Sequence, residues 1–383
     1  VKNVLDQFFS ISGLQTNLFK SKVLFSPNTD PLTKTTISNT LGISSTNDLG
    51  KYQGFPITLS KSPTKSFQFL LEKVQKKLQG WKSSLLSFAG RKAILQQCIS
   101  SIPMYFFQAA SIPKNIFQAI DREQRNFLWG STSDKRKIHL LNWDTITLKK
   151  SQEGLGLRKT LLLNKAGLSK TGWHLLKGFS KPWVNILSDL YLDRAQSLAQ
   201  NRLFLTTSKG SINLKNLKVG KDIIERGLGW NVGNGLSLKV WTSNWFTTSS
   251  LRSLIQGPLH SYEEHLRVAD LFDSNGGWNL QLLSFFLTLE ISSLILSTPR
   301  SHHVVSEDCL KWSPSIDGYF QLKSAYELAS NAKENAPLPP TISFNWILSL
   351  QVPNRIRFFI WLVNHDRLAT RQLLHQRNIL PDN

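Results

Sequence analysis

The chain has 383 residues, of which 40% are hydrophobic and 19% charged, and it carries a formal net charge of +21. Its 12 Trp and 22 Phe supply enough apolar material for two or three packed units, which excludes a largely disordered protein. The two cysteines, Cys98 and Cys309, are too few for a secreted disulfide framework, so we expect an intracellular protein of the nucleus or cytoplasm. Because position 1 is Val and the one methionine is Met104, we expect a segment of a longer product.

Positive charge is concentrated in the first part of the chain. Residues 1–150 hold 21 Lys and Arg against 8 Asp and Glu, whereas residues 151–383 hold 25 against 17. Such an excess indicates a polyanionic partner, either nucleic acid or an anionic membrane surface. The most apolar stretch, residues 278–296, contains Gln281 and Glu290 and is interpreted as a buried helix rather than a membrane span. We therefore expect nucleic acid as the partner and no membrane.

Residues 1–57 have the pattern of a mixed α/β unit. An amphipathic helix is predicted over residues 1–12, ending at Gly13, which suits a helix C-terminus. A short strand is predicted at residues 22–26 and a turn at 28–31. Residues 41–57 contain two short apolar pieces around Asn-Asp-Leu-Gly, which indicates a hairpin.

Residues 64–129 have helical periodicity and a basic surface. Apolar residues recur at helical spacing from Phe67 to Trp81, and Pro113 is predicted to begin a helix over residues 114–128. Lys and Arg side chains lie on the polar sides of these helices, which is the arrangement expected of a surface that contacts phosphates. The predicted nucleic-acid-binding residues are Lys73, Lys76, Lys77, Arg91, Lys92, Arg122 and Arg125.

The remainder of the chain mixes helices with short strands. Mostly helical structure is predicted up to about residue 222, and residues 236–241 alternate like a strand. Residues 310–323 alternate again around Asp317-Gly318, which indicates a hairpin, and residues 344–380 are predicted to be helical. The expected fold class is α+β and predominantly α.

Several motifs occur in an unusual order. Residues 80–129 contain Gly-Trp-Lys, Leu-Leu-Ser-Phe-Ala-Gly-Arg, Ser-Ser-Ile-Pro and Phe-Leu-Trp-Gly, and further patches lie at residues 141–144, 230–235, 323–326 and 358–361. This order resembles plant LINE-type (non-LTR) retrotransposon reverse transcriptases. The resemblance implies four parts: the carboxy-terminal end of the palm (1–57), a helical thumb (58–150), a connector (151–300), and the amino-terminal part of a zinc-binding-like domain (301–383).

The resemblance also implies roles for residues of the palm remnant. Residues 12–22 resemble the motif that follows the catalytic aspartates, and Lys20 matches a lysine that assists departure of pyrophosphate. Residues 49–56 resemble a primer-grip hairpin, although Gln53 replaces the usual apolar residue there. The implied primer-grip residues are Gly50, Tyr52, Gly54 and Phe55.

The chemistry of polymerisation is not expected in these residues. Nucleotide transfer needs paired carboxylates that hold two metal ions, and the sequence contains no Asp-Asp pair. The resemblance places the Mg²⁺-binding aspartates before Val1 and the Zn²⁺ ligands beyond Asn383. The adjacent acids at 263–264 and 307–308 are interpreted as surface charge, and Cys309 with His302-His303 does not suit a tetrahedral zinc site. No metal or other cofactor is therefore expected for this chain.

Three functional hypotheses follow. The first is a reverse transcriptase fragment without its catalytic aspartates that retains non-specific binding of an RNA or DNA template-primer. The second is a co-opted protein that binds other proteins through its Trp-rich carboxy-terminal half. The third is an inactive pseudogene product. The sequence leaves the oligomeric state open.

Overall fold

The computed structural model describes residues 1–52, 54–57, 63–81, 83–99, 101–102, 104–132, 134–199, 201–206, 211–273, 277–285, 287–299, 306–331 and 345–379. The chain divides into two units, residues 1–69 and residues 70–383. Helices predominate in the described residues, and the few strands are short. This confirms the predicted class, α+β and predominantly α.

The first unit begins with helix α1 (Lys2–Ser12), as predicted. Gly13 ends the helix in the left-handed conformation, with φ of 67°, and its N–H donates to the carbonyl of Phe9. A side chain would strain this conformation, which is why glycine suits the position. None of the residues of α1 is buried.

A second helix, α2 (Pro31–Leu41), follows where the sequence predicted only a turn. The Asp30 carboxylate accepts a hydrogen bond of 2.9 Å from the backbone N–H of Thr33, and Pro31 occupies the first helical position. The helix was missed because its Thr- and Ser-rich sequence lacks an apolar face. The strand predicted at residues 22–26 is wrong: only Val23 forms an isolated bridge, to Ser45.

The predicted hairpin is present but its turn lies further along the chain. Strands β1 (Lys51–Tyr52) and β2 (Phe55–Pro56) pair antiparallel. The turn therefore lies between them rather than at Asn-Asp-Leu-Gly. Gly54, with φ of 83°, occupies this turn, while Gln53 lies outside the described residues. The Phe55 ring packs edge-on against Phe67 with ring centroids 6.3 Å apart.

Helix α3 (Pro63–Gln79) contains the boundary between the units, and the remaining elements belong to the second unit. Its main helices are α4 (Phe88–Ile94), α5 (Met104–Ala109), α6 (Lys114–Trp129), α7 (Trp143–Ile146), α8 (Thr160–Lys177), α9 (Pro182–Tyr191), α10 (Arg194–Ala199), α11 (Ile212–Gly227), α12 (Leu289–Leu296), α13 (Leu322–Asn331), α14 (Asn345–Ser349), α15 (Asn354–Asn364) and α16 (Arg371–Gln376). A π-helical turn, η2 (Leu95–Ile99), follows α4 directly. Short 3₁₀ turns are η1 (Ser83–Leu85), η3 (Lys150–Gln152), η4 (Leu251–Leu254), η5 (Glu263–His265), η6 (Val268–Leu271) and η7 (Leu280–Leu282).

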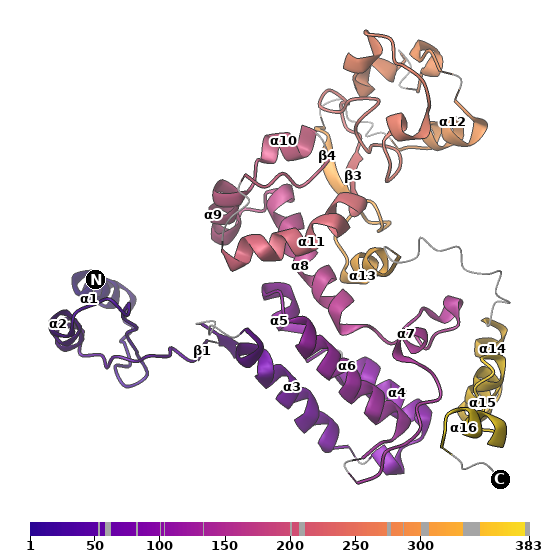
Figure 1. Cartoon of the computed structure of the whole chain (residues 1–383). Coiled ribbons are helices and arrows are strands. Elements are labelled where there is room, and N and C mark those ends of the chain that lie inside the picture. Colours follow the sequence, from indigo (N-terminus) through magenta and orange to yellow (C-terminus); the bar gives the residue numbers. More distant parts are fainter. Residues whose placement is uncertain are drawn as a thin grey trace. The chain divides into compact units, whose positions relative to one another are not determined.

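Helix α8 is the centre of the second unit and packs against α5, α11 and α13 (Figure 1). Close approach of these helices depends on small residues. A Cβ atom at Gly167 would lie 2.6 Å from the carbonyl oxygen of Phe107 in α5, and one at Gly220 would lie 2.7 Å from the backbone of Ser169. Both positions therefore exclude larger residues, because the facing atoms belong to the backbone.

Two buried asparagines connect the end of α5 to the helices that follow. The Asn164 amide donates to the carbonyls of Phe107 and Ala110 at 2.9 and 2.8 Å. The Asn216 amide donates to Ala109 O at 3.0 Å and accepts from the N–H of Ser111 at 2.7 Å. These bonds satisfy backbone groups that helix α5 leaves unpaired at its end, and they fix α5 against α8 and α11.

The strand prediction was only partly right in this unit. β3 (Leu228–Asn231) pairs antiparallel with β4 (Cys309–Trp312), so a long connection rather than a hairpin joins them. The predicted turn at Asp317-Gly318 exists, and the Trp312 N–H donates to Gly318 O at 2.8 Å, but helix α13 follows instead of a strand. The strand predicted at residues 236–241 is wrong, since only an isolated bridge at Lys239 forms there.

The long buried helix predicted at residues 278–296 is also wrong. That stretch contains the 3₁₀ turn η7 and the eight-residue helix α12, of which only Ile295 is buried. Among the described residues, no helix has the length and apolar character that crossing a membrane would require.

Two acidic residues interpreted as surface charge instead hold loops together. Glu263 is fully buried and accepts bonds from the N–H and hydroxyl of Ser284 at 2.9 and 2.8 Å. The Asp308 carboxylate accepts from the N–H groups of Gly233, Gly235 and Ser237 at 2.8–3.0 Å. The prediction failed because adjacent acids give no sequence signal of their distant hydrogen-bond donors.

Candidate nucleic-acid interface

A groove of about 950 Å³ lies between the end of α3, helix α6 and the loop that follows α6. We call it the α3–α6 groove. Polar side chains predominate in its lining, as expected of a surface that contacts a hydrated polyanion rather than an apolar ligand. It is lined by Gln75, Leu78, Gln79, Trp81, Ser83, Ser84, Arg122, Glu123, Arg125, Asn126, Phe127, Ser131, Thr132, Arg136, Lys137 and His139.

Positive charge dominates the groove. Arg122, Arg136 and Lys137 are exposed, Arg125 is half-buried, and none of the four forms an ion pair within the described part of the chain. The Nε–H of Arg125 is buried without a hydrogen-bond partner there. The one acid of the lining, Glu123, accepts a hydrogen bond of 3.1 Å from the Gln75 amide. Four cations are therefore free to contact phosphates.

The loop after α6 is held by hydrogen bonds at both ends. The backbone N–H of Lys137 donates to the Ser131 hydroxyl at 3.0 Å. The Arg377 guanidinium donates to the carbonyls of His139 and Leu140 at 2.9 and 2.8 Å. A loop fixed in this way presents Arg136 and Lys137 at a defined position, which lowers the entropy cost of binding.

Aromatic groups lie beside the cations. Trp81 is 41% exposed in the groove, which leaves part of its ring free to stack on a base. His139 stacks on Trp129 with ring centroids 6.2 Å apart. Burial, with a smaller contribution from the charge of Arg125, lowers the pKa of His139, so this imidazole is neutral at pH 7. The arginines and Lys137, not His139, thus supply the charge.

The predicted lysine ridge lies on α3. Lys73, Lys76 and Lys77 are all exposed, while Leu70 and Val74 on the opposite face are fully buried. The Lys73 ammonium lies over the Phe106 ring, 5.1 Å from its centroid. The ridge is thus on the outside of the helix that forms one wall of the groove.

Arg91 and Lys92, which were also predicted to bind nucleic acid, do not line the groove. The Arg91 guanidinium donates to the carbonyls of Leu128, Ser83 and Leu86 at 2.8–3.0 Å. These bonds fix the end of α6 against η1 and use three of the five guanidinium N–H groups, and Arg91 is not among the residues that line the groove. Lys92 lines a separate pocket together with residues of α15. The structure therefore groups Arg122 and Arg125, but not Arg91 or Lys92, in the groove.

The residues with implied catalytic roles belong to the first unit. Lys20 is exposed, and Tyr52 is 66% exposed on β1. Gly50 and Gly54 both have positive φ, at 71° and 83°, which suits the bends on either side of β1. The β1–β2 hairpin exists, while its role as a primer grip stays a prediction.

Sequence reasoning missed Trp81, Arg136 and Lys137 as members of the groove. Lys135, Arg136 and Lys137 form a basic run between two helices, and this run was the available signal. Its position beside α3 could not be predicted from the sequence, because the run lies more than 50 residues after the end of α3 at Gln79.

The described residues do not suit a zinc site. No three His, Cys, Asp or Glu side chains within them converge as metal ligands. Cys98 is half-buried on η2 and Cys309 is exposed on β4, while His302-His303 lie outside the described residues.

Parts of the chain are similar to known proteins. Residues 320–383 match the family described as zinc-binding in reverse transcriptase. The chain is 29% identical over 334 residues to an Arabidopsis thaliana protein named "Putative ribonuclease H protein", a match that covers 86% of this chain and 53% of that relative. It is 23% identical over 146 residues to an uncharacterized mitochondrial protein of Arabidopsis thaliana, covering 38% of this chain and 92% of the relative.

The chain thus spans about half the length of the first of these relatives. The family match lies within the part predicted to be zinc-binding-like, although the predicted start of that part at residue 301 stays a prediction. The family match and the two relatives together support a relationship between this chain and reverse-transcriptase-related retroelement proteins.

Proposed function

We propose that the chain is part of a LINE-type reverse transcriptase and that its α3–α6 groove binds RNA, DNA or hybrid duplex without strong sequence preference. The observation that carries this proposal is the group of four cations in the groove, Arg122, Arg125, Arg136 and Lys137, none of which has a carboxylate partner among the described residues. Cations that contact phosphates fix a protein on the backbone but do not read sequence. The predicted four-part division of palm, thumb, connector and zinc-binding-like region belongs to the same proposal.

Binding is tested by the salt dependence of affinity for a fluorescent duplex. Each phosphate contact contributes about 0.9 to the slope of log affinity against log salt on duplex DNA. Replacement of Arg122, Arg136 and Lys137 by Ala should reduce that slope by about 2.7. The control is Lys215→Ala, because Lys215 is exposed on α11 and lies outside the groove. An unchanged slope in the triple variant would refute the groove as the binding surface.

The lysine ridge is tested separately. If the bound strand extends over the outer face of α3, replacing Lys73, Lys76 and Lys77 by Ala lowers the affinity and the slope further. If affinity and slope stay unchanged, the ridge is a solvated face and binding is confined to the groove.

We also infer that these residues alone do not polymerise DNA. The sequence has no Asp-Asp pair, and two metal ions need such carboxylates. Primer extension with Mg²⁺ or Mn²⁺, measured after removal of contaminating polymerase, should therefore be absent. In a polypeptide that also contains the family's palm aspartates, Lys20→Ala should slow turnover if Lys20 assists the leaving group.

A role in protein binding has less support. The hypothesis relied on the tryptophans of the carboxy-terminal half, where Trp346 is 46% exposed but Trp241, Trp245 and Trp312 are at most 1% exposed. The latter three side chains form the core of the second unit and are not available to a partner.

A further inference from the structure

A second pocket, of about 190 Å³, lies between α4, the η3 turn and the α14–α15 segment. Three cationic side chains from three separate elements contribute to it: Lys92 from α4, Lys150 from η3 and Arg357 from α15. We call it the three-cation pocket. The remaining lining consists of Phe88, Ala89, Glu153, Gly154, Leu155, Ile347, Asn354, Phe358 and Trp361.

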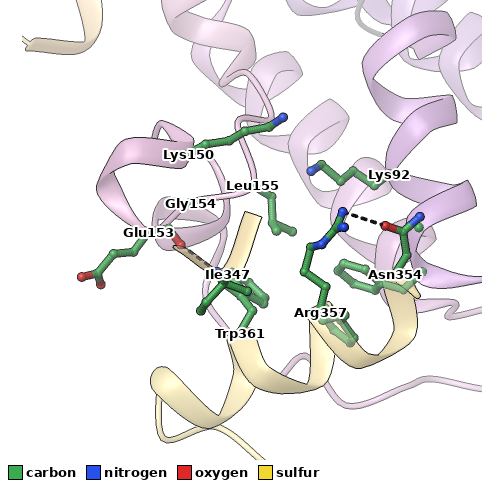
Figure 2. Close-up of a pocket in the computed structure, with 12 residues that line it drawn as sticks. Lys92, Lys150, Glu153, Gly154, Leu155, Ile347, Asn354, Arg357 and Trp361 are labelled. Carbon is green, nitrogen blue, oxygen red and sulfur yellow. Dashed lines mark hydrogen bonds between the residues drawn. The ribbon is translucent and has the colours of Figure 1, made fainter. Parts of the chain in front are cut away.

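The three cations converge without a neighbouring counter-ion. Figure 2 shows the nitrogen ends of Lys92, Lys150 and Arg357 turned toward one another, while the carboxylate of Glu153 points away from them. None of the three forms an ion pair within the described ranges. Glu153 contributes its backbone carbonyl instead, which accepts a hydrogen bond of 2.8 Å from the indole N–H of Trp361. Burial, together with the positive charges of Lys150 and Arg357, lowers the pKa of Lys92 to about 8.

Arg357 keeps hydrogen-bond donors available. Its Nη1 donates to Asn354 Oδ1 at 3.1 Å, and its Nη2 donates to the carbonyls of Leu350 and Val352 at 2.7 and 3.4 Å. These bonds orient the guanidinium and use three of its five N–H groups. The Nε–H is buried without a partner among the described residues. A ligand with several acceptor oxygens can therefore bind without displacing any existing bond.

The walls of the pocket are apolar. The rings of Phe88 and Phe358 stack with centroids 3.7 Å apart, and Ile347 and Trp361 are buried. Charges beside such walls interact more strongly than charges in open water. Burial of Lys92 beside two like charges destabilises the fold unless an anion binds between them.

We propose that the three-cation pocket binds a phosphate monoester, carried either by the end of a nucleic-acid strand or by a free mononucleotide. A monoester bears a charge of about −1.5 to −2 near pH 7 and offers three acceptor oxygens, which complements three converging cations. The pocket is smaller than the range of about 300–1,000 Å³ typical of drug-sized ligands, so it suits one phosphate group better than a whole nucleotide chain. The part of this proposal in which a nucleic-acid strand carries the phosphate rests on the proposed function.

The proposal has a structural consequence. Lys92 and Lys150 precede α8, whereas Arg357 lies in the segment that matches the reverse transcriptase zinc-binding family. A phosphate bound to all three would join these segments. Ligand binding should therefore raise the thermal midpoint of the whole chain, because it favours the folded state.

The test compares oligonucleotides of one sequence that carry a 5′-phosphate, a 3′-phosphate or hydroxyl groups at both ends, and in a separate arm uridine monophosphate. We expect a phosphorylated end to bind at least tenfold more tightly than the hydroxyl form, and Lys92→Met or Arg357→Gln to remove that preference. Lys150→Met provides a second variant with an intact fold, since Lys150 is exposed. Lys215→Met, outside both pockets, should leave the preference unchanged. Circular dichroism checks the fold of each variant.

The outcomes separate the two proposals. If the groove variant weakens all oligonucleotides equally and the preference for a phosphorylated end persists, both proposals hold. In a second outcome, no oligonucleotide binds, but uridine monophosphate binds to the original chain and not to Lys150→Met. The pocket then binds a free mononucleotide, and the groove proposal alone is wrong. If phosphorylated and hydroxyl ends bind equally and uridine monophosphate does not bind, the pocket proposal is overturned.

Discussion

Helices α1 and α8 both have apolar faces, but they differ in what covers those faces. In α8, twelve of 18 residues are buried against α5, α11 and α13. In α1, Val4, Phe8 and Ile11 are 68%, 52% and 87% exposed, and no residue from 1 to 52 is buried. The comparison shows that an amphipathic pattern forms the helix, whereas stability comes from the elements that pack against it.

The two units, which differ in how many side chains they bury, also contain different proposed functional residues. The residues with implied catalytic roles, Lys20 and the β1–β2 hairpin, lie in the unit that buries few side chains. The α3–α6 groove and the three-cation pocket lie in the unit with the extensive core. We therefore expect binding to depend on the second unit and to be insensitive to changes near Lys20.

The largest expected effect is a difference in amide hydrogen exchange between the two units. Exchange protection follows the free energy of local opening, which is small where few apolar side chains are buried. Amides of α8 should be protected more strongly than amides of α1 by a factor on the order of 10³ or greater. Mass spectrometry of labelled peptides measures both in one sample. Equal protection of the two helices would show that the contrast is wrong.

A matched pair of aromatic substitutions sharpens the comparison. Trp312 is fully buried and its indole N–H donates to the Ser324 hydroxyl at 2.8 Å, whereas Phe8 is half exposed. Trp312→Ala should lower the free energy of unfolding by about 3–5 kcal/mol because it leaves a cavity. Phe8→Ala should change it by less than about 0.5 kcal/mol. Urea denaturation measures both, and a comparable loss in the two variants would contradict the burial contrast.

Lys92→Met should stabilise the second unit. The pKa of Lys92 is lowered to about 8 in the folded chain, against 10.5 for an ordinary lysine. Below pH 8 the folded state therefore bears the full cost of a protonated lysine beside two cations, and this cost disappears as pH rises toward 10.5. The variant should have a higher thermal midpoint at pH 7, with the difference shrinking to nothing near pH 10.5. A lower midpoint at pH 7 would mean that Lys92 contributes to stability.

The smallest expected effect concerns Asp121 on α6. Burial raises the pKa of this carboxyl to about 6, against the opposing effect of a hydrogen bond from the Thr160 hydroxyl. Because the folded state holds the proton more tightly than the unfolded state, the Asp121 contribution to stability decreases as pH rises from about 4 to 6. Asp121→Asn should remove that decrease. The measurement is the thermal midpoint of the original chain and of the variant at each pH between about 4 and 7. If the two thermal midpoints change with pH in the same way, Asp121 does not titrate in this range.

The sequence predicted local features well where one element determines them. Helix α1 with its end at Gly13, and helix α6 with its start after Pro113, both follow from capping residues and apolar spacing. The order of short motifs also indicated the reverse transcriptase relationship that the match at residues 320–383 supports.

Features that depend on distant partners could not be predicted. β3 and β4 are strands because they pair across about 80 residues, while residues 236–241 alternate but pair with no strand among the described residues. Arg91 resembles any surface arginine in the sequence, yet the carbonyl of Leu128 lies within hydrogen-bond distance of it. The three-cation pocket joins Lys92 to Arg357 and has no local signal at all.

We propose that the second unit binds nucleic acid through the α3–α6 groove, and hydrogen exchange with and without a bound duplex tests this proposal most directly. Amides in residues 75–85 and 122–139 should exchange more slowly in the complex, and those of α1 and α11 should not change. The proposal would be contradicted if neither groove segment were protected in the complex, or if protection were confined to α1 and the β1–β2 hairpin.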